Sequence, residues 1–205
     1  MSSNVRRPYD PAVRRAAVVA AVMAATERLL AGGVSFTELG IKQIAAEVGL
    51  ARSTFYLYFS SKTELVLRLV EALHSPNWES SEGTPVDLEA ITEAYRTGIA
   101  FFRERKLVLA AVLEAAAYDP EVGAAWEGYR RKFVQREVGL LRAEQAAGRT
   151  PAEVDAQAAA EVIIWGGFQV ITHHVTTRGP ERDDIIAQEL AANQYYGVYR
   201  RGVRG

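Results

Sequence analysis

The 205-residue sequence contains no cysteine, which excludes disulfide bonds, zinc sites with cysteine ligands and thiol catalysis. Nothing in the chain therefore requires an oxidising compartment, and we expect a cytoplasmic protein of bacterial type. No apolar run approaches the roughly 18 residues that a membrane span needs, so we expect no membrane partner. Arg14 and Arg15 precede a short alanine-rich stretch, which we interpret as an amphipathic first helix rather than a signal peptide.

Catalytic signatures are also missing from the sequence. It has no nucleophile elbow, no HExxH zinc motif, no phosphate-binding P-loop and no dinucleotide fingerprint. His173 and His174 are adjacent, so on a helix they would point in different directions and could not easily share one metal ion. We expect neither an enzyme nor a metal site nor a bound cofactor.

Strand patterns are absent too, because no stretch alternates apolar and polar residues between hairpin turns. Helix starts are well marked, since a capping side chain stands directly before a proline at Asp10-Pro11, Thr84-Pro85, Asp119-Pro120 and Thr150-Pro151. Apolar residues make up 49% of the chain, enough for a sizeable core. The sequence therefore predicts an all-α fold of about nine helices, over 11–31, 40–48, 52–59, 61–74, 85–104, 107–117, 120–147, 151–177 and 181–199.

The charge is divided unevenly between two expected domains, 1–62 and 63–205, which the helix 61–74 connects. Residues 1–62 hold eight basic and four acidic groups, a net charge of +4, whereas the whole chain carries −1. A basic N-terminal third on an acidic body suggests a polyanionic partner at that end.

The segment 41–59 has the layout of a helix-turn-helix. Ile44 and Val48 share one apolar helical face, and Gly49 then supplies a residue that can adopt positive φ for a tight turn. Phe55 and Phe59 are four positions apart, so they lie on one side of the second helix and can anchor it to the first. We expect a three-helix helix-turn-helix domain at the N-terminus.

The opposite side of that second helix carries side chains that suit DNA phosphates and base edges. Leu57 could contact a thymine methyl group, and Lys62 lies where a helix N-terminus and a cation can hold one phosphate. For Tyr56 and Tyr58, the alternative to contact with the DNA backbone is packing between helices. The candidate DNA-binding residues are Lys42, Arg52, Ser53, Thr54, Tyr56, Leu57, Tyr58 and Lys62.

A second group of basic residues precedes the helix-turn-helix. Arg6, Arg7, Arg14 and Arg15 could form an arm that reaches DNA, or could be a solvated basic end. The sequence leaves these two interpretations open.

Large aromatic residues recur on three helices of the body, where they could converge on an apolar pocket or fill a core. Gly166 and Gly167, in the middle of one of these helices, suggest the close approach of another helix or a ligand. We expect Glu137 at the edge of the pocket, in contact with water. If its side chain pointed inward instead, it would favour a cationic or hydrogen-bonding ligand. The candidate ligand-binding residues are Tyr95, Ile99, Phe102, Trp126, Tyr129, Phe133, Trp165 and Phe168.

The last two helices have more apolar surface than one chain can cover. Residues 162–171 are strongly apolar, and Ile185, Ile186 and Leu190 follow on the next helix. A two-fold pairing of the eighth and ninth helices would bury both surfaces, so we expect a homodimer.

The string STFYLYFSSKTE at 53–64, preceded by IAAEVGL at 44–50, resembles the DNA-binding signature of the TetR family of transcriptional regulators. The resemblance implies a three-helix DNA-binding domain, a connecting fourth helix, a variable ligand-binding body and a dimer built from the last two helices. Two positions depart from the family pattern: Gly40 replaces the usual Ser or Thr, and Ser60 replaces a frequent proline.

The body also resembles one branch of that family. The stretch YRTGI at 95–99 and the spacing of Trp126 and Phe133 are similar to the ethionamide-resistance regulator branch, in which an aromatic tunnel accepts long apolar ligands. The sequence as a whole predicts a ligand-responsive repressor that binds palindromic double-stranded DNA as a homodimer and is released by a small apolar effector. The alternative is a helix-turn-helix DNA-binding protein without an effector.

Overall fold

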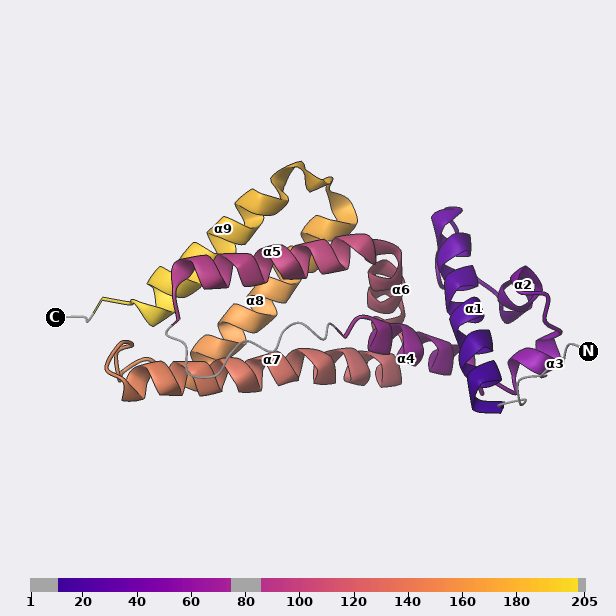
Figure 1. Ribbon diagram of the computed structural model, residues 1–205, viewed down its shortest axis with the longest axis horizontal. Helices are drawn as coiled ribbons and strands as arrows, with labels where there is room; N and C mark the ends of the chain where they lie inside the picture. Colours follow the sequence, from indigo (N-terminus) through magenta and orange to yellow (C-terminus); the bar gives the residue numbers. More distant parts are fainter. Residues whose placement is uncertain (1–10, 75–85, 203–205) are drawn as a thin grey trace, which may run out of the picture. The chain divides into compact units, whose positions relative to one another are not determined.

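The computed structural model describes residues 11–74 and 86–202, and within these ranges the chain forms helices and turns but no strand (Figure 1). Two compact units are present, one ending at Leu69 and the other beginning at Val70. The helices are α1 (Pro11–Ala31), α2 (Ile41–Glu47), α3 (Arg52–Phe55), α4 (Lys62–Ala72), α5 (Leu88–Glu104), α6 (Lys106–Ala116), α7 (Pro120–Ala146), α8 (Ala156–Thr177) and α9 (Asp183–Gln194). The predicted all-α fold with nine helices is confirmed for the described part of the chain.

Two shorter helical segments accompany α9. The 3-10 turn η2 (Pro180–Arg182) precedes it, and the π-helical turn η3 (Tyr195–Tyr199) follows it. The single helix predicted over 181–199 is therefore divided into three segments. None of the described helices combines the length and the apolar character needed to cross a membrane.

The first unit packs α2 against both α1 and α3. Gly49, in the turn after α2, has φ of 68°, a left-handed conformation that glycine adopts without strain. The rings of Phe55 and Phe59 stack with their centroids 5.1 Å apart, and both side chains are fully buried. The predicted helix-turn-helix layout is thus present, with the two phenylalanines as its anchor.

The second helix of this motif is shorter than the predicted range 52–59. After α3, the amide of Leu57 donates to the carbonyl of Thr54 at 3.1 Å, and that of Tyr58 donates to Phe55 at 2.9 Å. These are three-residue hydrogen bonds, which tighten the chain into 3-10-like turns. The segment continues in a helical path as far as Phe59, whose amide donates to the carbonyl of Phe55 at 3.0 Å, although the α-helix itself ends at Phe55.

Capping residues explain where the helices of the second unit begin. Asp119 accepts hydrogen bonds from the amides of Glu121 and Val122, as the Asp-Pro pair predicts. The predicted start of α8 at Thr150-Pro151 is wrong, because Asp155 caps this helix by accepting from Ala158 at 2.9 Å. Asp10, Thr84 and Pro85 lie outside the described residues, and Asp87 caps α5.

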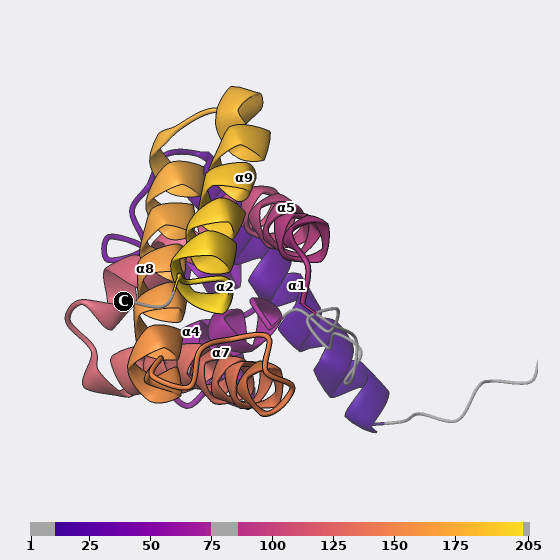
Figure 2. The same cartoon turned by 90° about the vertical axis from the view of Figure 1, so that its left-hand side faces the viewer.

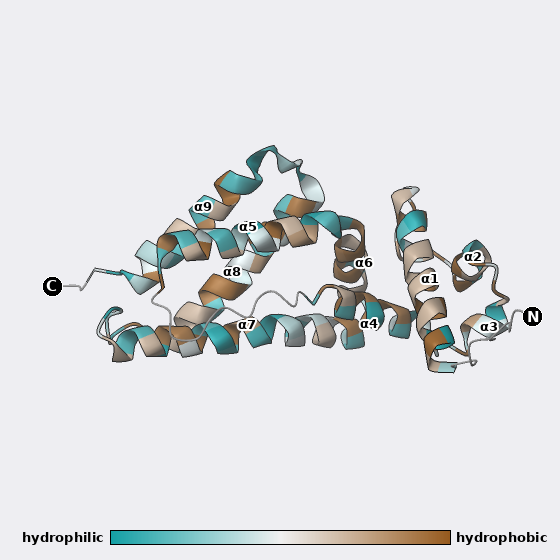
Figure 3. Ribbon diagram, viewed as in Figure 1, coloured by the Kyte–Doolittle hydropathy of each residue, from teal (hydrophilic) through white to brown (hydrophobic). Residues whose placement is uncertain are grey.

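The second unit is built around α7, whose 27 residues make it about 40 Å long. The helix α8 packs along α7 and also contacts α5 and α6, while α5 packs against α9. Figure 2 shows α9 lying between α5 and α8. Colouring by hydropathy shows α6 hydrophobic along most of its length, whereas α9 alternates hydrophilic and hydrophobic residues (Figure 3).

We expect substitutions of Gly49 to destabilise the first unit in proportion to their intolerance of positive φ. G49A should lower its free energy of unfolding by about 1–2 kcal/mol, since a Cβ is strained in the left-handed region. G49N should cost less, because asparagine visits this region more readily. Hydrogen exchange of the amides in 37–62, followed by mass spectrometry, measures the difference. Equal exchange in the two variants would contradict the role of backbone strain.

Candidate functional sites

The helix-turn-helix presents a row of polar side chains to solvent. Arg52, Ser53 and Tyr56 are exposed, while Thr54 and Tyr58 are half-buried beside the anchoring phenylalanines. Phe55 and Phe59 point inward, whereas Tyr56 and Leu57, which lie between them in the sequence, are exposed. The candidate DNA-binding residues of this segment therefore lie together on one accessible surface.

Leu57 stands out on that surface. It is 72% exposed, so its methyl groups are accessible for an apolar contact. Next to it, the guanidinium of Arg52 lies 5.8 Å above the ring of Tyr56 and 3.5 Å from its hydroxyl. The surface thus combines an apolar side chain with a partly oriented cation, a combination suited to a thymine methyl group and a base edge or phosphate.

Arg15 closes the C-terminal end of this segment. Its guanidinium donates to the carbonyl of Leu57 at 3.0 Å and to that of Tyr58 at 3.1 Å, and it lies over the ring of Tyr58. A cation at the C-terminal end of a helical segment compensates the carbonyls left without partners. Arg15 therefore positions residues 52–59, which we call the recognition segment, while Arg6 and Arg7 lie outside the described residues.

Lys62 is held by the loop that follows α1. Its ammonium donates to the carbonyl of Phe36 at 2.5 Å and to that of Thr37 at 3.2 Å, above the ring of Phe36. These contacts give Lys62 a bracing role that sequence reasoning missed. Lys42 is exposed on α2.

The N-terminus of α2 at Gly40 is capped by a side chain from within the helix. Gly40 has no side chain to cap α2, but the side-chain oxygen of Gln43 accepts from the Gly40 amide at 2.8 Å. Half of a capping box thus remains where the family usually has a hydroxyl.

The second unit contains a pocket of about 420 Å³ between α5, α7, α8, α9 and η3. Four predicted ligand-binding residues line it, namely Tyr95, Phe102, Phe133 and Phe168. The apolar lining continues through Ile91, Ile163, Ile164 and Ile171.

The other four candidate residues lie beside the pocket rather than in its lining. Ile99, Trp126 and Tyr129 are buried, and Trp126 and Tyr129 pack ring against ring at 5.5 Å. Trp165 is half-buried beneath the guanidinium of Arg130, 4.3 Å from its ring. The structure therefore divides the aromatic residues between a filled core and a pocket wall.

Gly167 faces the pocket, whereas Gly166 faces outward. A Cβ at Gly167 would lie 3.5 Å from the hydroxyl oxygen of Tyr95, while a Cβ at Gly166 would meet nothing within 4 Å. A Cβ at Gly167 would make only an ordinary van der Waals contact, so the close approach of another helix does not explain either glycine.

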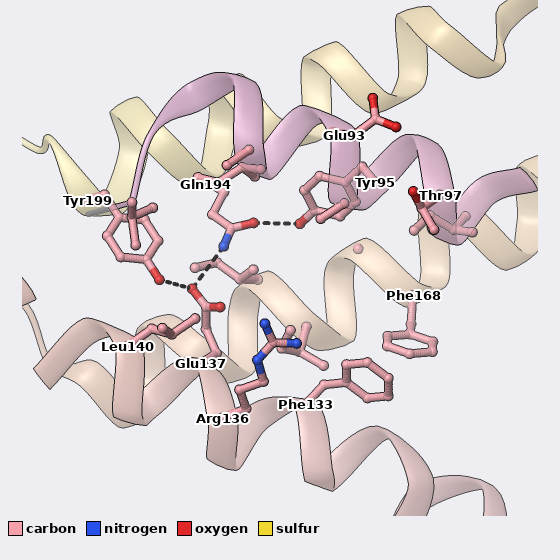
Figure 4. Close-up of a pocket in the computed structure, with 18 of the residues that line it drawn as sticks. Glu93, Tyr95, Thr97, Phe133, Arg136, Glu137, Leu140, Phe168, Gln194 and Tyr199 are labelled. Atoms are coloured by element: carbon pink, nitrogen blue, oxygen red, sulfur yellow. Dashed lines mark hydrogen bonds between the residues drawn. The ribbon is translucent and has the colours of Figure 1, made fainter. Parts of the chain in front are cut away.

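A chain of hydrogen bonds crosses one end of the pocket (Figure 4). The hydroxyl of Tyr95 donates to the amide oxygen of Gln194 at 2.8 Å, and the amide nitrogen of Gln194 donates to Oε1 of Glu137 at 2.9 Å. The hydroxyl of Tyr199 donates to the same carboxylate oxygen at 2.7 Å. Three elements, α5, α9 and η3, thereby converge on one carboxyl group of α7.

The expectation that Glu137 lies at the edge in water is wrong, because its side chain is only 6% exposed. Burial raises the pKa of Glu137, and the hydrogen bonds from Tyr199 and Gln194 together with the charge of Arg136 oppose that rise. Burial also raises the pKa values of the Tyr95 and Tyr199 hydroxyls, and the charge of Glu137 raises them further. Both tyrosines are therefore neutral donors.

Gln194 and Tyr199 are pocket residues that sequence reasoning missed. The π-helical turn η3 interrupts the 3.6-residue repeat at this point, so Tyr199 faces inward at a position where a continuous α-helix would place it differently. No periodic pattern in the sequence identifies such a turn. Their aromatic and amide side chains near the end of the helix predicted over 181–199 are the only signal that the sequence offers.

A second buried carboxylate fixes the end of α7. Glu144 accepts hydrogen bonds from Arg149 at 2.7 Å and from Arg200 at 3.2 Å, and the hydrogen bonds from Arg149 are the main cause that lowers its pKa. Thr150 donates to the carbonyl of Tyr199 at 3.0 Å. These contacts tie η3 to the C-terminal end of α7 and so help to hold Tyr199 beside Glu137.

Comparisons with known proteins match both units. The family model for the bacterial regulatory proteins of the tetR family matches residues 22–69, and the model for the C-terminal domain of the transcriptional regulator EthR matches residues 91–192. The chain belongs to the TetR family. Its C-terminal body is EthR-like, and no enzyme family is indicated.

A curated relative supports this membership. The chain is 30% identical over 145 residues to the HTH-type transcriptional regulator EthR of Mycolicibacterium smegmatis. That alignment covers 67% of this chain and 65% of the relative, so the chain spans just under two thirds of the length of the curated relatives it matches.

Solved structures share the fold at low sequence identity. Salmonella enterica GusR aligns with a TM-score of 0.72 at 17% identity, covering 96% of this chain and 100% of that one. NalD of Pseudomonas aeruginosa, described as the secondary repressor of a multidrug efflux pump, aligns with a TM-score of 0.70 at 15% identity, covering 90% of this TetR-family chain and 98% of its own.

We expect the stability of the body to fall as Glu137 ionises. The pKa of this carboxyl is raised in the folded state. At a pH below its ordinary pKa of 4.5, the group is neutral in both the folded and the unfolded state. As the pH rises from there through the pKa of the folded state, the unfolded state ionises more readily, and the folded state is destabilised. Each unit of pKa increase corresponds to about 1.4 kcal/mol. E137Q removes this contribution, and its melting temperature relative to that of the wild type should therefore increase as the pH rises above about 4.5, the ordinary pKa of the carboxyl. A difference that does not change with pH would contradict the buried, ionisable carboxyl.

Proposed function

We propose that this TetR-family chain is a DNA-binding transcriptional regulator that acts as a repressor. Its affinity for a palindromic operator would be controlled by a small molecule bound in the pocket of its second unit. The observation that carries DNA binding is the exposed row of Arg52, Ser53, Tyr56 and Leu57 beside a fully buried Phe55 and Phe59. A helical segment that buries its two phenylalanines and exposes a cation, hydroxyl groups and the methyl groups of a leucine suits the major groove.

The proposed contacts divide between base edges and phosphates. We assign base edges to Arg52, Ser53 and Thr54, which begin the recognition segment, and a thymine methyl group to Leu57. Tyr56 and Tyr58 are assigned to the DNA backbone together with Lys42. Lys62 is assigned a bracing role, since its ammonium is engaged by two carbonyls of its own chain.

We expect R52A to weaken DNA binding by about tenfold, the loss typical of one specific arginine contact. The probe is a fluorescent duplex selected by the wild-type protein from a randomised library, and anisotropy measures the affinity over a range of salt concentrations. The matched control is R131A, which removes the same charge from an exposed position on α7 and should bind as the wild type does. Wild-type affinity that barely depends on salt would contradict the proposal, because phosphate contacts release counterions.

A homodimer through α8 and α9 is supported by apolar side chains exposed on these helices. Val162 is 73% exposed and Val170 41%, and they lie about two helical turns apart on α8. Ile185 on α9 is 45% exposed. A second copy related by a two-fold axis would cover the same surface on both chains, which is why we propose a dimer as the DNA-binding form.

We expect V162E to convert the dimer into monomers at micromolar concentration, because the interface would bury an unpaired charge. Analytical ultracentrifugation measures the change, with a dissociation constant at least about tenfold higher than that of the wild type. V13E introduces the same residue at an exposed valine of α1 and should leave the dimer intact. A dimeric V162E protein would place the interface elsewhere.

A small apolar effector is supported by the pocket itself. Its volume of about 420 Å³ falls in the range of small-molecule sites, and most of its lining is aliphatic or aromatic. The alternative, a DNA-binding protein without an effector, would need no cavity of this size in the body. An effector can change DNA affinity only by binding one conformation of the dimer better than another.

A further inference from the structure

One oxygen of the buried Glu137 carboxyl is left for a ligand. Its Oε1 accepts from Tyr199 at 2.7 Å and from Gln194 at 2.9 Å, whereas no described residue donates to its Oε2. In Figure 4 the second oxygen points away from Tyr199 and Gln194, on the side that faces the pocket. Since the side chain is only 6% exposed, bulk water does not satisfy this oxygen freely.

The hydrogen-bond chain is oriented so that the carboxyl acts as an acceptor. Tyr95 donates to the oxygen of Gln194, which turns the amide nitrogen of Gln194 toward Glu137. Tyr199 donates to the same carboxylate oxygen. All donors in this series of hydrogen bonds therefore point toward Glu137. Both direct donors go to its Oε1, so its Oε2 remains available to a donor from the pocket.

The other acidic residue in the pocket lining, Glu93, is exposed to solvent. Glu93 lies at the exposed side of α5, where it forms an ion pair with Arg96 at 3.5 Å. Solvent screens such a pair, so Glu93 contributes little to selection of a buried ligand. Glu137 is the acidic group that a bound molecule would contact away from water.

We propose that the effector of this pocket is an apolar molecule carrying a protonated amine, which donates to Oε2 of Glu137. This inference rests on the proposed function of the pocket and names the chemical class of its ligand. The rings of Phe102, Phe133 and Phe168 would contain the apolar part of the molecule. An ammonium group compensates a buried carboxylate that otherwise has only neutral donors, and a charge-assisted hydrogen bond is stronger than a neutral one.

The raised pKa of Glu137 agrees with this assignment. Burial without a cationic hydrogen-bond partner raises the pKa, so a bound ammonium would stabilise the ionised form and lower it again. Arg136, which also lines the pocket, lowers this pKa through its charge but not enough to offset burial.

Three probes of similar size and different charge test the proposal: phenylbutylamine, phenylbutanol and phenylbutyrate. Isothermal titration of the full chain near neutral pH measures their affinities. We expect the wild type to bind the amine about tenfold or more tightly than the alcohol, and the alcohol more tightly than the acid. In E137Q the amide oxygen can still accept from Tyr199, so the pocket is retained, and the preference for the amine should disappear.

E127Q is the matched control, because it makes the same charge change on α7 at an exposed residue that pairs with Arg131. Its preference for the amine should equal that of the wild type. Circular dichroism establishes that each variant is folded, and if E137Q does not fold, the wild-type ranking of the three probes decides the question.

The outcomes separate this inference from the proposed function. Wild-type protein that binds the alcohol as tightly as the amine would overturn the inference and leave an apolar effector site. A preference for the amine that survives in folded E137Q would also overturn it, since the aromatic rings alone would then be attracting the cation. Protein that binds none of the three probes would contradict the effector pocket itself.

Discussion

The stacked pair Phe55 and Phe59 decides which side of the recognition segment faces solvent. The α-helix α3 has only four residues, too few to be stable alone, so packing rather than helix propensity keeps this segment in place. Both rings are fully buried, and the guanidinium of Arg15 holds the carbonyls that follow. The exposed arginine, hydroxyl and tyrosine groups gain a defined orientation only because the other side of the segment is immobilised. Any surface built from these groups depends on the two phenylalanines.

A comparable constraint governs the body. Glu137 is an acidic group removed from water, and such a group is tolerated because Tyr199 and Gln194 donate to it. The same contacts join α7 to α9 and η3, while Tyr95 extends the chain to α5. The polar end of the pocket is therefore also a junction between helices. A molecule bound there would act directly on the hydrogen bonds that connect α5, α9 and η3 to α7, which is a physical route from a small ligand to the arrangement of the body.

Much of the fold is predictable from the sequence because its signals are local. Asp119 caps α7 through its own neighbouring amides, and Gly49 turns the chain because glycine alone lacks the steric penalty. The spacing of four residues between Phe55 and Phe59 is enough to predict that they share one side of a helix. The prediction that Thr150 caps a helix is wrong, because a sequence pattern cannot distinguish a capping threonine from one that donates to a distant carbonyl, here that of Tyr199.

The candidate sites are predictable to different degrees. The recognition segment occupies consecutive residues, so its composition already indicates which side chains are exposed. The pocket requires helices that lie far apart in the sequence to meet, and only four of its eight candidate residues line it. The others, including Trp126 and Tyr129, lie beside it, and these two pack against each other in the core. Helical spacing identifies a shared side of a helix, but not whether a neighbouring helix fills the space in front of it.

The sequence by itself determined the helical character of this protein, the tight turn at Gly49 and the side of the recognition segment that carries the phenylalanines. Each of these depends on residues within one or two helical turns of each other. Tertiary structure alone decided that Glu137 is buried, that Lys62 and Arg15 brace the chain, and that Gln194 and Tyr199 complete the pocket. These outcomes depend on contacts between residues as many as 99 positions apart, which arise only when the helices pack and water is excluded between them.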